Sequence, residues 1–186
     1  MDEKITSNNF EFNGQHYTQI DGTAIGSKLG RNYACTYLGA WEKELLSKTE
    51  KKPLTFWRYI DGIWGIWELV EEELVKFQTC ASTIHENIQI VLRHSQKEIE
   101  FLDVKTLLND NNKITTDLYE KKSNAHLYLH QKSNHPNHTK DKIAYGLAIR
   151  AKRICSNNED YRRSKNDIQE RLLKRGHNRN TIRTSG

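Results

Sequence analysis

Apolar and polar residues alternate along several short segments of the chain, and pairs typical of tight turns interrupt them. This alternation predicts one hairpin over residues 9–20, with Asn13-Gly14 as its turn, and another over residues 56–67, with Asp61-Gly62 as its turn. Both pairs favour type I′ turns, because the two central positions of that turn need a positive φ. Asp61 is therefore expected at a hairpin tip, where a rigidly held carboxylate could bind a metal ion or could serve the turn alone.

Three further segments show the same alternation. Residues 88–92 are predicted to form a strand, and residues 99–104 and 114–119 a pair of strands joined by the asparagine-rich segment 109–112. The tryptophans of the second hairpin are expected as core residues or cross-strand pairs, with a stacking surface for bases as the alternative; they are Trp57, Trp64 and Trp67.

Apolar residues at helical spacing predict four helices, over residues 27–47, 68–86, 140–156 and 161–175. Ser27 or a neighbour is expected to cap the first helix. In the third, the expected stripe consists of Ile143, Leu147, Arg150 and Ile154. Helices interspersed with hairpins predict an α+β fold in which helices pack on an antiparallel sheet.

Length and composition limit the classes of protein to which this chain can belong. The 186 residues are enough for one domain or a large part of one, and 35% are hydrophobic and 28% charged. No segment has the length of a membrane span and the first residues lack the order of a signal peptide, so we expect no membrane contact and an intracellular protein. Cys35, Cys80 and Cys155 are expected to be reduced packing residues.

Charge is divided unevenly along the chain. Residues 1–119 contain 13 basic and 18 acidic residues, whereas residues 120–186 contain 16 basic and 6 acidic ones. We therefore distinguish a mixed segment, 1–119, from a basic segment, 120–186. The basic segment fits a phosphate backbone, although a solvated charged face is the alternative.

Two other patterns are weaker indications of a ligand. The glycine-rich residues 21–30 precede a helix, where backbone N–H groups could approach a phosphate, but the Gly-Lys-Ser/Thr sequence of a phosphate loop is absent. His126, His130, His135 and His138 cluster in sequence without paired cysteines, so an ordinary polar loop is favoured over a metal site.

Residues 9–28 and the segment Arg58-Tyr59-Ile60-Asp61-Gly62 are followed, in order, by segments 101–104, 117–121, 133–138, 150–156 and 175–177. Together these segments resemble the reverse transcriptases of Penelope-like retroelements. Residues 9–28 are similar to polymerase motif B with its lead-in, residues 58–62 are similar to motif C, usually Tyr/Phe-x-Asp-Asp, and the later segments resemble the family's lower palm and thumb. The resemblance implies the distal part of a right-hand polymerase palm over 1–119 and a basic connection with thumb helices over 120–186.

The resemblance also implies a chemistry. In this family two divalent ions, Mg²⁺ or in its place Mn²⁺, join a primer 3′-hydroxyl to a nucleotide phosphate. Asp61 matches a catalytic, metal-binding carboxylate of motif C. In the family, the motif B loop contacts template and nucleotide. The residues of this chain that match that loop are Gln19, Gly22, Gly26, Ser27 and Lys28. The implied partners are an RNA template, a DNA primer and the half of the polymerase with the fingers and motif A, and the implied location is the nucleus. Contacts with the nucleic-acid backbone are expected from Arg58, Lys121, Lys122, Arg150 and Arg153.

Departures from the family pattern bear on activity. Gly62 replaces the second carboxylate of motif C, and Gly30-Arg31 replace Ala-Pro after motif B. The resemblance places motif A and the fingers upstream of Met1, and a GIY-YIG-type endonuclease after the thumb; neither is expected within residues 1–186. We therefore expect a reverse transcriptase fragment without polymerase activity. The alternatives are a remnant that only binds nucleic acid and a structural fragment without a ligand.

Overall fold

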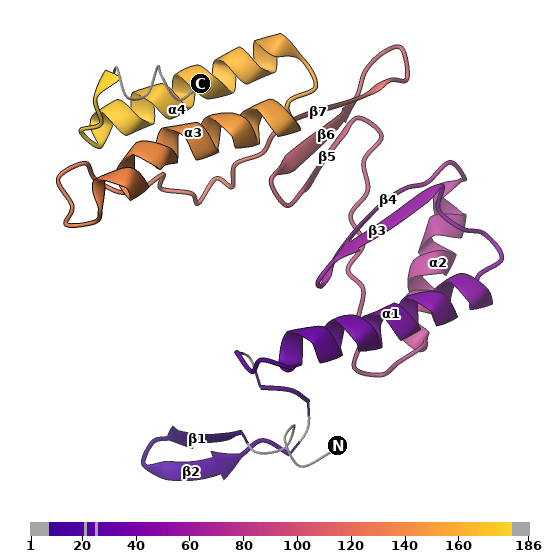
Figure 1. Ribbon diagram of the computed structural model, residues 1–186. Helices are drawn as coiled ribbons and strands as arrows, with labels where there is room; N and C mark the ends of the chain where they lie inside the picture. Colours follow the sequence, from indigo (N-terminus) through magenta and orange to yellow (C-terminus); the bar gives the residue numbers. More distant parts are fainter. Residues whose placement is uncertain (1–7, 21, 25, 180–186) are drawn as a thin grey trace. The chain divides into compact units, whose positions relative to one another are not determined.

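The computed structural model describes residues 8–20, 22–24 and 26–179, which belong to two compact units divided between Leu92 and Arg93 (Figure 1). The division thus lies before the rise in basic residues near position 120. The first unit contains β1 (Asn9–Phe12), β2 (Gln15–Thr18), α1 (Gly30–Lys48), β3 (Thr55–Tyr59), β4 (Gly62–Ile66) and α2 (Glu71–Thr83). The second contains β5 (Glu98–Phe101), β6 (Val104–Leu108), β7 (Ile114–Leu118), α3 (Asn137–Ile154) and α4 (Asn158–Lys174). A mixed α+β architecture with small antiparallel sheets is confirmed.

The first hairpin, β1–β2, forms as predicted. Asn13 and Gly14 have φ values of 52° and 74°, so both central residues take the positive φ that a type I′ turn requires. Phe10 pairs with Tyr17, and their rings stack at 5.5 Å. The turn residues and this aromatic pair together fix the register.

The second hairpin, β3–β4, forms, but its predicted turn is wrong. Tyr59 pairs with Gly62, so Ile60 and Asp61 form the two-residue loop. Ile60 has a φ of 57°, while neither Asp61 nor Gly62 has a positive φ, which excludes a type I′ turn at Asp61-Gly62. Asp61 still lies at the tip.

Cross-strand packing explains the shifted register of β3–β4. Trp57 lies directly opposite Trp64, and their rings stack at 5.2 Å. Phe56 lies opposite Gly65, where a Cβ would lie 2.5 Å from the Thr55 carbonyl oxygen. The aromatic pair and the glycine therefore outweigh the turn preference of Asp-Gly.

The core of the first unit lies between α1, α2 and one face of the β3–β4 hairpin. Trp41, Leu45 and Ala81 are buried, and the half-buried Phe56 and Ile63 pack against them. The predicted strand over residues 88–92 does not form. Its isoleucines pack on the same core instead, and the Ile90 carbonyl accepts a hydrogen bond of 2.9 Å from the Gln78 amide. Alternation here reflects packing without a partner strand.

The second unit has a three-stranded antiparallel sheet in the order β5-β6-β7 instead of the predicted strand pair. Phe101 pairs with Val104 across a two-residue turn, Leu102-Asp103, in which Leu102 has a φ of 55°. The segment predicted as one strand over 99–104 therefore reverses direction. The turn has no glycine or asparagine to reveal it, whereas the predicted asparagine-rich connection at 109–112 is confirmed.

Helices α3 and α4 lie side by side and run in opposite directions (Figure 1), joined by residues 155–157. Their shared core contains Ala144, Ala151, Ile168 and Leu172. The predicted stripe of α3 is displaced by one position, because small side chains face α4: Ala144, Ala148 and Ala151 are buried, while Arg150 is exposed. Alanines let two helices approach closely, so the larger Ile143 and Leu147 pack at the margin.

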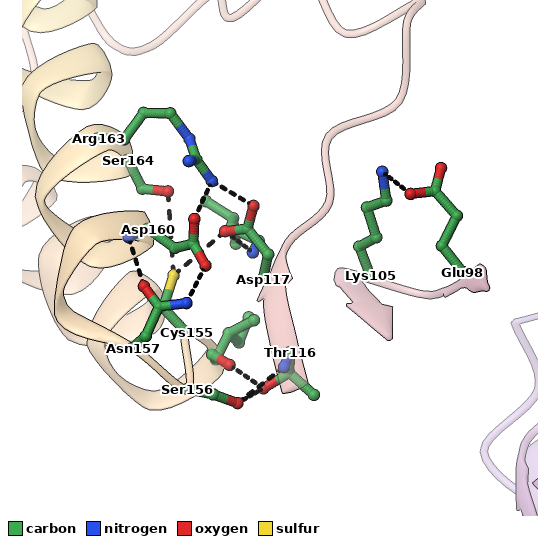
Figure 2. A network of polar contacts seen from close by, with 12 residues as sticks. Glu98, Lys105, Thr116, Asp117, Cys155, Ser156, Asn157, Asp160, Arg163 and Ser164 are labelled. Carbon is green, nitrogen blue, oxygen red and sulfur yellow. Dashed lines mark hydrogen bonds and ion pairs between the residues drawn. The ribbon is translucent and has the colours of Figure 1, made fainter. Parts of the chain in front are cut away.

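A network of polar contacts joins the sheet to the helical pair (Figure 2). Thr116 of β7 donates from its backbone N–H to the Ser156 hydroxyl at 2.7 Å and from its own hydroxyl to the Ile154 carbonyl at 2.5 Å. Asp117 binds Arg163 of α4 at 2.5 Å and accepts a contact of 3.5 Å from the Cys155 thiol. Burial raises the pKa of that thiol, so Cys155 stays protonated near neutral pH. The network fixes β7 against the turn between the helices.

The Leu172→Ala variant should lose about 2–5 kcal/mol of unfolding free energy, because this side chain is completely buried and its removal leaves a cavity. Leu173→Ala is the matched control, since the same helix loses the same atoms from a side chain that is 36% exposed. It should lose less than about 1 kcal/mol. Urea denaturation followed by circular dichroism measures both, and equal losses would contradict this core assignment.

The Ile60→Gly variant should gain about 1 kcal/mol of unfolding free energy, because glycine adopts a positive φ without the penalty that a β-branched residue incurs. Ile60→Ala retains the Cβ and should gain little. Thermal unfolding of both variants checks the difference between them. A loss of stability in the glycine variant would show that the isoleucine is not strained.

Candidate nucleic-acid interface

Asp61 is exposed at the tip of β3–β4, where the alternation of apolar and polar residues predicts a hairpin turn. Among the described residues, no group of three or more histidine, cysteine, aspartate or glutamate side chains could hold a metal ion. Gly62 begins β4 without a positive φ, so a side chain at that position would not be excluded by backbone conformation. Asp61 is therefore an accessible carboxylate that belongs to no such group.

Arg58 lies behind this tip and is engaged by other groups. Its Nε is 2.5 Å from Glu42 Oε1 of α1, and this hydrogen bond raises the pKa of the guanidinium. Its Nη1 donates to the Ile60 carbonyl at 2.9 Å and its Nη2 to the Cys35 carbonyl at 3.3 Å. With the side chain only 13% exposed, these contacts give Arg58 a structural role in joining the hairpin to α1.

The loop that resembles motif B is described except at Asp21 and Ile25, which lie outside the described residues. Gly22 and Gly26 have φ values of 74° and 91°, so both use the conformational freedom of glycine. The Ser27 hydroxyl accepts a hydrogen bond of 2.8 Å from the Gly30 N–H at the start of α1, which satisfies one of the free donors of that helix end.

Two other residues of this loop differ in their surroundings. Gln19 forms backbone and side-chain hydrogen bonds with Asn8, of 2.9 and 3.0 Å. Lys28 is exposed. The loop is thus held at Gln19 and at Ser27, on either side of its two positive-φ glycines.

The residues of the second unit that are predicted to contact phosphates differ in whether an acidic group neutralises their charge. Lys121, Lys122 and Arg153 are exposed, and each lacks a side-chain hydrogen bond or ion pair within the described part of the chain. Arg150 lies 2.7 Å from Asp103, with both side chains largely exposed, so its charge is partly compensated.

Three basic side chains of this unit, Lys140, Arg171 and Arg175, are instead bound to an extended segment, residues 120–136. The buried Lys140 ammonium donates to the carbonyls of Gln131 and Ser133 at 3.0 and 3.2 Å. Arg175 Nε donates to the Tyr128 carbonyl at 2.7 Å. Sequence reasoning counted these cations toward a binding surface, and nothing in their spacing distinguishes them from exposed ones.

Arg171 and His177 hold the same segment. Arg171 Nη1 binds both carboxylate oxygens of Glu120, at 2.7 and 2.6 Å, and lies 3.1 Å from His126 Nδ1. The buried His177 ring lies 2.8 Å from the Leu129 carbonyl. The segment is therefore fastened along its length to α4 and its C-terminal end.

Two small polar hollows border this segment. One, of about 290 Å³, is lined by residues that include Asp103, Tyr119, Tyr128 and Arg150. The other, of about 100 Å³, is lined mainly by the charged residues that join β7 to α4. Neither is a large apolar cavity of the kind that holds a small organic ligand.

The two units differ in charge. Up to Leu92 the chain has 9 basic and 13 acidic residues, a net charge of −4, and from Arg93 onward it has 20 basic and 11 acidic residues, a net charge of +9. The net electrostatic attraction for a polyanion is therefore expected from the second unit.

Comparison with known proteins finds a similarity that falls in this unit. Residues 127–185 match the family model of the animal helix-turn-helix domain. The matched range contains both α3 and α4, which a three-residue connection joins. No curated protein and no solved structure matches the chain. None of the described helices is long and apolar enough to cross a membrane.

Proposed function

We propose that the second unit binds nucleic acid through contacts with the phosphate backbone. The observation that carries this proposal is the net charge of +9 on the unit that contains the helix-turn-helix match. Exposed cations without acidic partners attract phosphates, whereas base recognition needs side chains that reach into a groove. Lys121, Lys122 and Arg153 are the proposed contacts, and Arg150 joins them if the phosphate displaces Asp103.

We further propose that the chain is part of a reverse transcriptase of the Penelope-like type. The ordered motif resemblances support this proposal, as does a hairpin that presents Asp61 at its tip. Under it, α3 and α4 belong to a thumb that grips an RNA template paired with a DNA primer. Mg²⁺ would supply the charge stabilisation of phosphoryl transfer, with Asp61 as one ligand.

The described residues do not fit two such ions. Each Mg²⁺ ion in a nucleotidyl-transfer site is usually held by one or two carboxylates together with substrate oxygens. Around Asp61 no set of three ligand side chains gathers among the residues that the structure describes, and Gly62 offers none. We therefore propose that this chain binds nucleic acid without extending a primer.

Binding to a labelled RNA–DNA duplex should weaken steeply with salt. If three or four phosphates are contacted, the slope of log K against log salt should be about −2.7 to −3.6, so affinity should fall about 40- to 150-fold between 50 and 200 mM salt. Fluorescence anisotropy measures it, and a duplex of unrelated sequence should bind equally. Absence of binding at 50 mM salt would favour a structural fragment without a ligand.

Primer extension on a homopolymer template should show no incorporation with Mg²⁺ or Mn²⁺ beyond that of the Asp61→Ala control. Gly62→Asp should not restore it, because one added carboxylate still leaves too few ligands for two ions. Incorporation by the unaltered chain above the Asp61→Ala level would contradict the proposed loss of catalysis. It would leave the proposal of duplex binding intact.

A further inference from the structure

The two matched helices carry different net charges. α3 has five basic residues and one acidic residue, whereas α4 has five basic and four acidic ones. In DNA-binding helix-turn-helix proteins, the second helix enters the major groove. Here the excess of positive charge lies on the first.

The solvent-facing side of α3 carries cations that no acid compensates. At 100° per residue, Lys142, Ile149 and Arg153 lie opposite the buried alanines of α3, and Ile149 is half-buried. Lys142 and Arg153 are exposed, and neither has an ion pair or side-chain hydrogen bond within the described residues. Gly146 lies between them with no atom near its Cβ position, and Tyr145 beside it is 53% exposed. The surface is open and basic, with a hydroxyl donor at its edge.

The solvent-facing side of α4 is acidic at its centre. Glu159, Asn166 and Glu170 lie opposite the buried Ser164, Ile168 and Leu172. Of the cations that flank this line, Arg163 pairs with Asp117 and Asp160, and Lys174 pairs with Glu170. Arg162 is exposed and has no acidic partner among the described residues. Two exposed glutamates along the axis would repel a phosphate backbone.

We propose that α3, through Lys142 and Arg153, is the helix that lies against the nucleic-acid backbone, and that α4 supports it from behind. This rests on the proposed function, since it assigns the binding face of the same unit. Lys142 and Arg153 are eleven residues apart, or about 16 Å along the helix axis, so they contact separate phosphates. Backbone contacts of this kind hold a duplex without selecting its sequence.

The test compares two double variants of the full chain that each remove two positive charges. Lys142→Gln with Arg153→Gln alters α3, and Arg162→Gln with Lys165→Gln alters α4, where these residues also have no acidic partner among the described ones. Anisotropy titrations with an RNA–DNA duplex at 50 to 200 mM salt give the affinity and the salt slope. Circular dichroism confirms that both variants fold like the unaltered chain.

The α3 variant should lose at least tenfold in affinity at 100 mM salt, and its salt slope should become shallower by about 1.8, or 0.9 per lost phosphate contact. The α4 variant should lose less than threefold and keep its slope. An equal or larger loss in the α4 variant would overturn the assignment of the face while the proposed function stands. Absence of binding by the unaltered chain would overturn both. If the α3 variant unfolds, Lys142→Glu alone replaces it, with Arg162→Glu as its control, and the same ordering of losses is required.

Discussion

Close packing between the alanine side of α3 and the apolar side of α4 determines how the second unit is organised. Buried Ala144, Ala148 and Ala151 leave room for Ile168 and Leu172, so the two helices share one narrow core. The residues of a helix keep fixed angular positions around its axis. Burial of these alanines therefore also determines which residues of α3 face solvent. The exposed position of Lys142 and Arg153 follows from a contact on the opposite side of the same helix.

Basic residues in this unit therefore fall into two kinds that composition cannot separate. Lys140, Arg171 and Arg175 donate to carbonyl or carboxylate groups of the segment over residues 120–136, which lacks strand or helix hydrogen bonds of its own. A buried carbonyl needs a donor, and a long cation can supply one from a distance. Other cations, such as Arg163 and Lys174, are paired with acids, so a count of charges overstates the binding surface.

The sequence predicted the hairpins and helices well where local rules act alone. Asn13-Gly14 forms its expected turn, and helical spacing located α1 to α4 within a few residues. It failed in two places. The second turn is displaced where Trp57 stacks on Trp64, and the chain reverses at Leu102-Asp103, where only Asp103 is of a turn-favouring type. Asp61 was correctly predicted at the tip of the second hairpin. The ion pair of Arg58 with Glu42 was not predicted, because it joins residues distant in sequence that no local pattern connects.

Those ties have a mechanical consequence. Arg58 binds Glu42 of α1 through its Nε and the Ile60 carbonyl through its Nη1. A single side chain therefore connects the helix to the loop that contains Asp61. Both bonds share one rigid, planar group, and a rotation of that group must alter them together. The conformation of the hairpin tip is thereby coupled to the position of α1. A shift of the helix at Glu42 would move the Arg58 guanidinium and, through it, the Ile60 carbonyl next to Asp61.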